Sequence, residues 1–461
     1  MTEPTLTEPP PTEPTPTWPV AKQLASLSWP IIGINVLNVL ALAVDTAMCG
    51  RLPNAEVALT ALGFATQLVF LLMVAMIGLT VGTVATVARA HGAGDPGRVE
   101  HTLQQSMQLT VLLGLGIAVL GNLFAASFVR VMGGSEPVVE AAVMYLRPML
   151  FATALPYLNI LFGAVLRGVG NTRIAFLVAL LINCLNAIFN YGLILGNFGL
   201  PAMGIAGAAW GTVAAYAIGV TAMVLLLRRG IEPAIQMRLR PTRIDRVLAA
   251  QLLRIGWPAA LDMVVLNAAF LSIVGMLGRI DEVAVAAHGI GLRIQALAFV
   301  PGLSVSQATG AMVGQALGAR NPERARAVMR ASLALCLAMM TVLTLIIIGF
   351  DHQILGIFKV DPESQLGRHA LTWMHLLGWG MPIAGAHIAY VGLLQGAGAT
   401  MTSLRINGIV TAIQIPLSYV LGFTLGLGVF GVWAAFPASF VLKVLLSSRA
   451  VRKGAWAKVK A

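Results

Sequence analysis

Apolar and polar residues follow one another along the chain in long blocks, and twelve of these blocks are strongly apolar. Each apolar block contains at least about 20 residues, the length that an α-helix needs to cross the hydrocarbon core of a bilayer. The blocks lie at residues 30–50, 57–82, 102–126, 138–165, 173–196, 205–227, 249–277, 284–314, 325–349, 366–394, 402–425 and 428–447. The pattern therefore predicts an all-α polytopic membrane protein with twelve transmembrane helices.

Polar stretches outside these blocks suggest how the chain is organised. Residues 1–21 are rich in Pro and Thr and lack the apolar core of a signal peptide, so we expect a disordered cytoplasmic tail there. The only long polar interruption, residues 228–248, separates two groups of six helices. We therefore expect an N-lobe at 22–227, an inter-lobe loop, a C-lobe at 249–447 and a basic C-terminal tail at 448–461.

The two groups of six helices repeat each other in sequence. GRL at 50–52 returns as GRI at 278–280, and LRGVGNT at 166–172 returns as LQGAGAT at 394–400, both 228 residues later. Six is an even number, so both repeats enter the membrane from the same side. A pseudo-two-fold axis along the membrane normal then relates the lobes, an arrangement that suits alternating access in a transporter. A channel remains an alternative, although channels usually surround a pore with identical subunits.

Composition agrees with a membrane protein. Hydrophobic residues make up 58% of the chain and charged residues 10%, against about 25% in a soluble domain, which excludes an ordinary soluble enzyme. If both termini are cytoplasmic, 23 of the 30 Lys and Arg residues fall in cytoplasmic segments and 5 fall outside. The net charge of +12 is thus spread over many loops. We expect a multi-pass protein of the bacterial inner membrane with both termini cytoplasmic and no nucleic-acid partner.

Two of the 18 acidic residues lie inside apolar blocks, Asp45 and Asp262. A carboxylate at the bilayer centre costs about 2.5–3.5 kcal/mol, so it should face a cavity, be paired or be protonated. Asp45 lies seven residues after Asn38, on the same helical face, and fifteen after Pro30, which can bend a helix. This pattern favours a proton or cation site at Asp45. The alternative is a carboxylate near a helix end that reaches interfacial water.

The block at 173–196 carries three asparagines on one stripe, at spacing i, i+3 and i+7. They are Asn183, Asn186 and Asn190. Amides can coordinate a cation or bond to a protonated carboxyl group, so the stripe is a candidate part of a coupling site. The alternative is that the amides hold neighbouring helices together.

A second candidate site lies in the C-terminal half. Asp262 follows Pro258 by four residues, and it is either a functional acid or a carboxylate favoured by the start of a helix. Arg293 is a candidate partner for Asp262. His387 can titrate near neutral pH, although a lone histidine in an apolar helix is more often structural.

Motifs for nucleotide-driven or metal-dependent chemistry are missing from the sequence. There is no P-loop for ATP and no HExxH pair, and Cys49, Cys184 and Cys336 lie far apart in apolar segments. We expect no enzyme activity and no cofactor or metal centre, and we expect an ion gradient as the energy source. An intramembrane transferase is disfavoured because it would need clustered acids or histidines.

Several motifs resemble the multidrug and toxic compound extrusion (MATE) family. They are VDTAMCGRL at 44–52, LRGVGNTR at 166–173, GLPAMGIAGAAWGT at 199–212 and, in the DinF-like branch, AAHGIGLRIQALAFVPG at 286–302. The family's bend-forming proline falls at Pro30. The resemblance implies antiport, in which protons or sodium ions enter while small lipophilic, often cationic, compounds leave.

The resemblance also implies particular site residues. The family's helix 1 acid falls at Asp45, and its helix 5 positions carry Asn186 and Asn190, as in NorM-like members. The acids that help those members to bind sodium in helices 7 and 10 would fall at Leu266 and Ala384. We therefore expect coupling at Asp45, with protons favoured and with sodium at Asp45, Asn186 and Asn190 as the alternative.

A different substrate class within the same superfamily is a lipid or polysaccharide precursor. A flippase for such substrates typically lines its cavity with several basic residues to hold phosphates. Here only Arg147 and Arg293 are candidates for that role, which disfavours the flippase. We expect small-molecule substrates, contact with membrane lipids and a monomer.

Overall fold

The computed structural model describes residues 17–235, 237 and 243–459, and every regular element in these ranges is a helix. The first half contains α1 (Thr17–Cys49), α2 (Ala55–Gly92), α3 (Pro96–Val131), α4 (Glu136–Phe151), α5 (Ala154–Val169), α6 (Arg173–Leu195) and α7 (Ile205–Arg228). The second half contains α8 (Arg246–Ile280), α9 (Glu282–Gly318), α10 (Pro322–Gly349), α11 (Asp351–Ile357), α12 (Gln365–Gly396), α13 (Thr400–Tyr419) and α14 (Gly428–Arg452). A π-helical turn (Val420–Thr424) follows α13, and a 3₁₀ turn (Ala455–Lys458) follows α14.

Within the described residues, eleven helices are long and apolar enough to cross a membrane, and α4 and α5 form a twelfth span bent by 52°. Proline explains the bend. Pro156 stands in the first turn of α5 and has no N–H, so the helix cannot continue through this point with its usual hydrogen bond. The carbonyl of Ala152, which a residue with an N–H at position 156 would serve, accepts instead from the N–H of Leu155 at 2.8 Å. The twelve predicted spans are confirmed with this one break.

The chain ends are more ordered than the sequence predicts. α1 begins at Thr17, so the last residues of the predicted 1–21 tail are helical, while residues 1–16 lie outside the described part. At the other end α14 continues to Arg452, and the buried ring of Trp456 packs back, donating from its indole N–H to the carbonyl of Val451. Part of the predicted 448–461 tail is therefore attached to the C-lobe.

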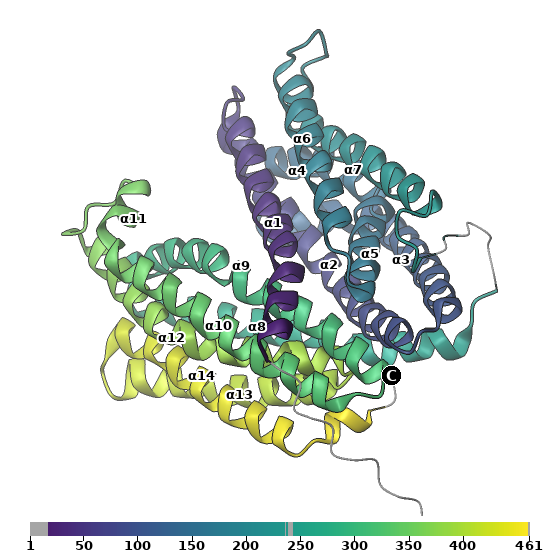
Figure 1. Ribbon diagram of the computed structural model, residues 1–461. Helices are drawn as coiled ribbons and strands as arrows, with labels where there is room; N and C mark the ends of the chain where they lie inside the picture. Colours follow the sequence, from purple (N-terminus) through teal and green to yellow (C-terminus); the bar gives the residue numbers. More distant parts are fainter. Residues whose placement is uncertain (1–16, 236, 238–242, 460–461) are drawn as a thin grey trace, which may run out of the picture.

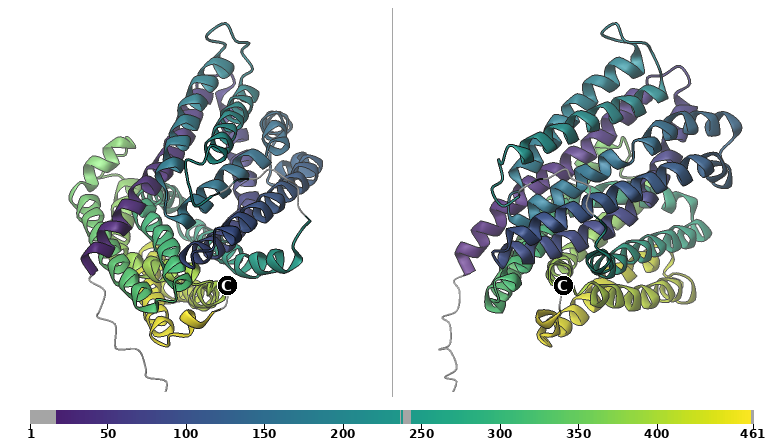
Figure 2. Two further views of the ribbon diagram at one scale, coloured as in Figure 1. Left: turned by 45° about the vertical axis from the view of Figure 1, so that its right-hand side comes forward. Right: turned by 90° about the vertical axis from the view of Figure 1, so that its right-hand side faces the viewer.

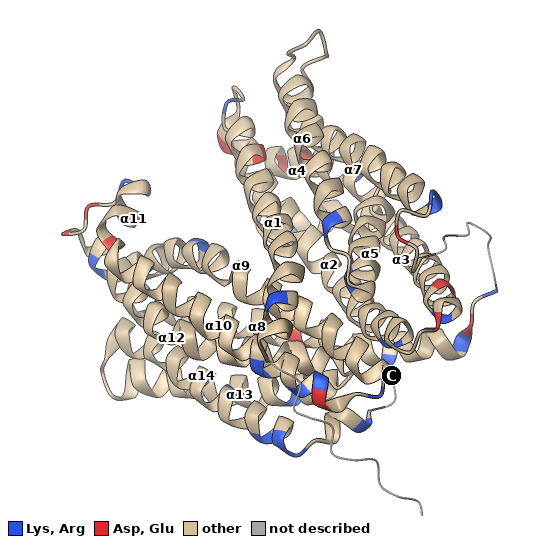
Figure 3. Ribbon diagram, in the orientation of Figure 1, with Lys and Arg blue, Asp and Glu red and all other residues tan. Residues whose placement is uncertain are grey.

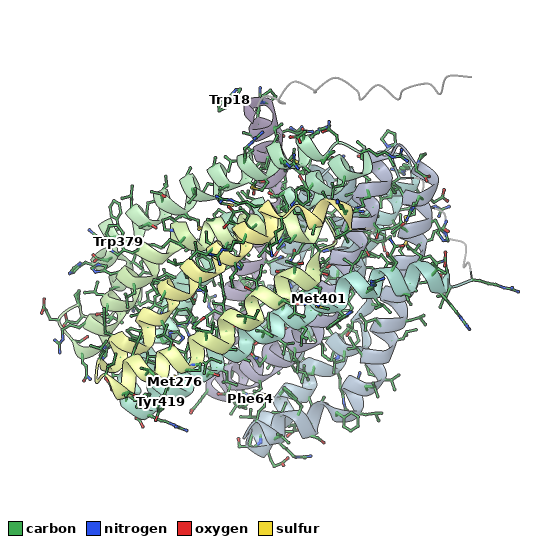
Figure 4. The ribbon with its side chains drawn as sticks, turned by 90° about the horizontal axis from the view of Figure 1, so that it is seen from below. Trp18, Phe64, Met276, Trp379, Met401 and Tyr419 are labelled. Carbon is green, nitrogen blue, oxygen red and sulfur yellow. The ribbon has the colours of Figure 1, made fainter. Side chains whose placement is uncertain are left out.

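The two halves form two bundles, as predicted. Figure 1 shows α1–α7 (purple to teal) as one lobe and α8–α14 (teal through green to yellow) as the other, and Figure 2 shows the same separation from two further sides. The lobes approach each other near the C-terminus and diverge toward α6 and α11. Large apolar side chains cover the outside of the bundles. Trp18 and Trp379 project outward (Figure 4), and Trp379 is 71% exposed, as expected of a lipid-facing surface.

The internal repeat is visible in hydrogen bonds as well as in sequence. Two bonds of the N-lobe recur in the C-lobe between residues that are 226 or 228 positions further along the chain. The pairs are Thr172–Leu27 with Thr400–Ile255, and Thr83–Ser106 with Thr309–Ser332. Because the same hydrogen bonds recur at equivalent positions, the two lobes share one arrangement of helices.

Backbone contacts hold the lobes together near one end. A Cβ on Gly82 of α2 would lie 2.4 Å from the carbonyl oxygen of Leu252 in α8, so only glycine allows these two helices to pack this closely. Nearby, the guanidinium group of Arg89 donates to the carbonyls of Ala397 and Val459 at 2.8 and 2.7 Å. Most Lys and Arg residues gather at this same end (Figure 3). The contact between the lobes is therefore at the basic end of the molecule.

Candidate functional site

The acid of α1 and one asparagine of α6 meet inside the N-lobe. α1 packs on α6, which places Asp45, one turn before the end of α1, beside Asn190. The side-chain amide of Asn190 donates a hydrogen bond of 2.6 Å to Oδ1 of Asp45. Asp45 is 9% exposed and Asn190 is fully buried. A buried carboxylate held by one amide is thus the centre of the candidate site.

The other polar residues predicted for this site have different surroundings. Asn186 is buried but donates to the hydroxyl of Thr212 in α7 at 2.9 Å. Asn183 donates to a carbonyl one turn earlier in its own helix at 2.7 Å, a common arrangement for a helical asparagine. Asn38 is exposed on α1. Within the described residues, the structure therefore joins only one of the four predicted amides to the carboxylate.

Space around the Asp45–Asn190 pair is set by a glycine that the sequence analysis did not single out. A Cβ on Gly211 of α7 would lie 2.1 Å from Oδ1 of Asn190, so a larger residue would displace the amide. That oxygen is buried and has no hydrogen-bond partner in the described part of the chain. An unpaired amide oxygen beside a carboxylate is suited to accept a hydrogen bond from a protonated carboxyl group or to coordinate a cation.

An aromatic residue of α4 packs beside the site. Tyr145 is buried in the same cluster as Cys49 of α1 and Ile194 of α6, each four residues from Asp45 or Asn190. Sequence reasoning did not find Tyr145 because its spacing carries no polar pattern. With Gly211 on α7, the surroundings of the pair come from α1, α4, α6 and α7. No group of three His, Cys, Asp or Glu side chains suited to a metal occurs among the described residues.

Pro30 lies inside α1, and the helix continues through it as one element. Proline has no N–H, so the carbonyl of Ser26 lacks its usual helical partner. Between Pro30 and Asp45, the amide of Asn35 donates to the hydroxyl of Ser304 in α9 at 3.0 Å. α1 therefore combines a weakened point, a contact with the opposite lobe and the buried acid.

The C-lobe contains a second buried acid with more partners. Asp262 lies in the middle of α8, sixteen residues after its start, so the alternative of a helix-start carboxylate is wrong. Its two oxygens accept hydrogen bonds from the amide of Asn407 at 2.8 and 2.9 Å, and Oδ2 also accepts from Ser403 at 3.1 Å. Both partners lie on α13, four residues apart and on one face. This polar pair is a sequence signal that we did not use.

Two residues were predicted to act with Asp262, namely Arg293 and His387. Only His387 is joined to it by hydrogen bonds. Arg293 is exposed on α9 and forms no salt bridge within the described ranges, so its predicted pairing with Asp262 is wrong. His387 of α12 is buried, and its Nε2 lies 3.1 Å from Oδ1 of Asn407 while its Nδ1 lies 3.1 Å from the hydroxyl of Ser447. His387 therefore joins Asp262 through Asn407.

Comparison with known proteins supports the same architecture. The sequence profile of the MatE family matches the chain twice, over residues 30–192 and 258–420. The probable multidrug resistance protein YoeA of Bacillus subtilis is 27% identical over 90% of both chains. The probable multidrug resistance protein NorM of Thermotoga maritima is 27% identical over 95% of this chain and 94% of that protein.

Solved structures share the fold. A MATE protein in the bent conformation has a TM-score of 0.87 at 22% identity, covering 96% of this chain and 98% of that one. An outward-facing MATE family transporter has a TM-score of 0.86 at 23% identity, covering 95% and 97%. The two profile matches begin 228 residues apart, which is the offset of the internal repeat. With well over half of its length matched, the chain belongs to the MatE family of multidrug and toxic compound extrusion transporters.

Proposed function

We propose that this protein is a secondary active antiporter that exports lipophilic, often cationic, compounds in exchange for protons by alternating access. Asp45 is the coupling carboxylate. The observation that carries the proposal is the buried hydrogen bond of 2.6 Å between Asn190 and Asp45, next to an amide oxygen without a partner. The substrate class follows the relatives, several of which are named multidrug resistance proteins.

Orientation in the membrane follows from the distribution of charge. Lys and Arg gather at the end where the lobes meet (Figure 3), and such residues favour the cytoplasmic side. The lobes then diverge toward the outside of the inner membrane, and both termini are cytoplasmic. Asp45 lies one turn from the outer end of α1, where a proton has a short path from outside. We expect a monomer surrounded by lipid.

Protonation of Asp45 changes what holds α1 in place. An ionised carboxylate needs the amide donor of Asn190, whereas a neutral carboxyl group can itself donate to the unpaired amide oxygen. Because Pro30 weakens α1, a change at Asp45 can alter the bend of the helix. The bond from Asn35 to Ser304 carries that change to the C-lobe. A proton and a substrate then favour different arrangements of α1.

Opening toward the cytoplasm requires the inter-lobe contacts to separate. These contacts include the close packing of Gly82 on Leu252 and the bonds from Arg89 to Ala397 and Val459. They are backbone contacts and a few hydrogen bonds at one end of each lobe. A rocking motion of two rigid lobes can break them without disturbing the core of either lobe.

Dye efflux from proteoliposomes tests the proposal, with a proton gradient and a sodium gradient imposed separately. An inward proton gradient should accelerate export of a cationic dye, and Asp45→Asn should abolish that acceleration. Glu136→Gln, an exposed acid at the outer end of α4, is the matched control and should export normally. Full proton-driven efflux by Asp45→Asn would overturn the proposal. If only the sodium gradient accelerates dye export, the coupling ion is sodium and not the proton.

Two other functions give different results in the same vesicles. A channel would pass a steady ion current without dye exchange. A flippase would move a fluorescent lipid instead of the dye, and it would need basic residues to hold a phosphate. The sequence offers only two candidates for that role, Arg147 and Arg293, which favours the antiporter.

A further inference from the structure

A lysine is buried inside the C-lobe. Lys443 of α14 is 5% exposed, and it forms no salt bridge in the described part of the chain. The group lies 5.7 Å from the centre of the Phe440 ring. Lys443 stands nine residues before the end of α14, or about 13 Å at 1.5 Å per residue, too deep to be a simple helix-end cation. A buried charge at this depth needs a counter-charge.

The acid of the same polar cluster is Asp262, which is also buried. No salt bridge of 4 Å or less joins the two side chains among the described residues. Lys443 and Ser447 lie four residues apart on one face of α14. Ser447 begins the line of hydrogen bonds that leads through His387 and Asn407 to the carboxylate. Helices α8, α12, α13 and α14 thus meet around one acid and one base.

The hydrogen-bond directions favour the ionised form of the acid. The amide nitrogen of Asn407 faces both oxygens of Asp262, so its Oδ1 faces His387. Nε2 of His387 must then donate to that oxygen, and Nδ1 accepts from the hydroxyl of Ser447. Every donor in the line points toward Asp262, and Ser403 adds another. This arrangement suits an ionised carboxylate and a neutral histidine protonated on Nε2.

We propose that the ammonium group of Lys443 supplies, within the C-lobe, the positive charge that a bound ion would otherwise supply. Its ammonium group neutralises Asp262, so the C-lobe stays closed to external monovalent cations and ion exchange is confined to the N-lobe. The inference rests on the proposed ion-coupled function and adds a residue that determines which lobe responds to ions. Without Lys443, the carboxylate of Asp262 and the hydroxyl of Ser403 are oxygen ligands that suit a hard cation such as sodium.

Sodium binding by the purified full-length protein tests the inference. Wild type should gain no thermal stability when choline chloride is replaced by sodium chloride at equal ionic strength. Lys443→Ala should lose stability in choline and regain it in sodium in a saturable way, because a ligand that binds only the folded state stabilises it. Radioactive sodium should bind the variant and not wild type. A folded Lys443→Ala protein that ignores sodium would overturn the inference.

Two controls separate charge balance from packing. Lys443→Arg keeps the positive charge and should remain insensitive to sodium. The double variant Asp262→Asn with Lys443→Met removes both charges, so it should fold and also ignore sodium. If Lys443→Ala does not fold, this double variant should still fold and be more stable than Lys443→Met alone. Equal instability of the single and double variants would contradict the charge pair.

The outcome is independent of the N-lobe. Sodium binding gained by Lys443→Ala should persist when Asp45→Asn is added, because the new site lies in the C-lobe. Loss of the gained binding in that combination would place the ion at Asp45 and overturn the inference. The assay measures binding and not transport, so its failure leaves the efflux test of the proposed function unaffected.

Discussion

The two lobes place the same kind of pair at different depths. In each lobe a buried aspartate on the first helix bonds to an asparagine 145 residues further along the chain, on the fifth span. Asp262, however, follows Asp45 by 217 residues, 11 fewer than the repeat offset. Eleven residues correspond to about 16 Å along a helix. The repeat therefore preserves which helices form the pair and not where along them it lies.

Residues at the equivalent positions explain why each lobe has only one such pair. The C-lobe counterparts of Asp45 and Asn190 are Ile273 and Ser418, and the position that corresponds to Asp262 in the N-lobe is Ile34. The side chains of Ile273, Ser418 and Ile34 carry no charge. The N-lobe acid has one donor and a neighbouring unpaired oxygen, while the C-lobe acid has several donors and an internal cation. In the proposed mechanism the N-lobe pair exchanges an ion and the C-lobe cluster does not.

The largest expected difference between the pairs is in stability. Asn407→Leu removes both amide bonds to Asp262 and the acceptor for His387, so it should lower the free energy of unfolding by about 3 kcal/mol. Asn190→Leu removes one bond to Asp45 and should cost about 1.5 kcal/mol. Denaturant unfolding in one detergent measures both. Equal losses of unfolding free energy in the two variants would contradict the view that Asp262 has more hydrogen-bond partners than Asp45.

A smaller change at the N-lobe pair should affect transport. In Gly211→Ala the new Cβ would push the amide of Asn190 away from Asp45, so proton-driven dye efflux should fall by at least about tenfold. The C-lobe counterpart is Ala435, a buried residue whose Cβ is already accommodated. Gly63→Ala is the control, since a Cβ there meets no atom within 4 Å. Normal efflux by Gly211→Ala would remove the geometric basis of the site.

Where the lobes are alike, equal changes should have equal effects. Thr172→Val and Thr400→Val each remove one buried hydrogen bond, to the carbonyl of Leu27 or of Ile255. Each should cost about 1 kcal/mol, and the double variant should show the sum because the sites are independent. Unfolding measurements on the three variants check this. A severalfold difference between the single variants would show that the lobes contribute unequally even where their sequences match.

The smallest effect is expected at an acid outside the membrane spans. Burial raises the pKa of Asp351, but hydrogen bonds from His352 and His375 outweigh burial and hold that pKa below its ordinary value. A lowered pKa contributes stability above the ordinary pKa, and this stability disappears as pH falls through the lowered value. Between about pH 5 and pH 8 the carboxylate therefore stays ionised.

Asp351→Asn should accordingly leave the pH profile of efflux unchanged between about pH 5 and pH 8. Efflux rates across that range, compared with those of wild type, check this. A shift of the profile as large as that caused by Asp45→Asn would show that coupling is not confined to the N-lobe pair.

Much of the architecture was predictable because it depends on local sequence. Twelve apolar blocks, the 228-residue repeat and the family motifs each describe a helix or its ends without knowledge of packing. The break between α4 and α5 also has a local signal in Pro148 and Pro156. Helix ends at Thr17 and Arg452 extend beyond the predicted spans because propensity does not stop at the membrane surface.

Partners inside the bundle were harder to predict, because they depend on how helices pack. Asp45 and Asn190 were both candidates, but nothing in their spacing excluded Asn183 from the contact. Arg293 was a reasonable partner for Asp262 by charge alone, yet Arg293 is exposed whereas Asp262 is buried. Lys443 lies four residues inside the apolar block 428–447, and this position is the local signal of a buried role.

Proton release on substrate binding tests the central claim most directly. Antiport requires that substrate and proton favour different states of the same protein, so binding of a cationic dye should release a proton from Asp45. The measurement uses purified protein in weakly buffered detergent between about pH 5 and pH 8. Wild type and the Asp262→Asn, Lys443→Met double variant should release protons, and Asp45→Asn should bind dye without release. Equal release by Asp45→Asn would contradict the account.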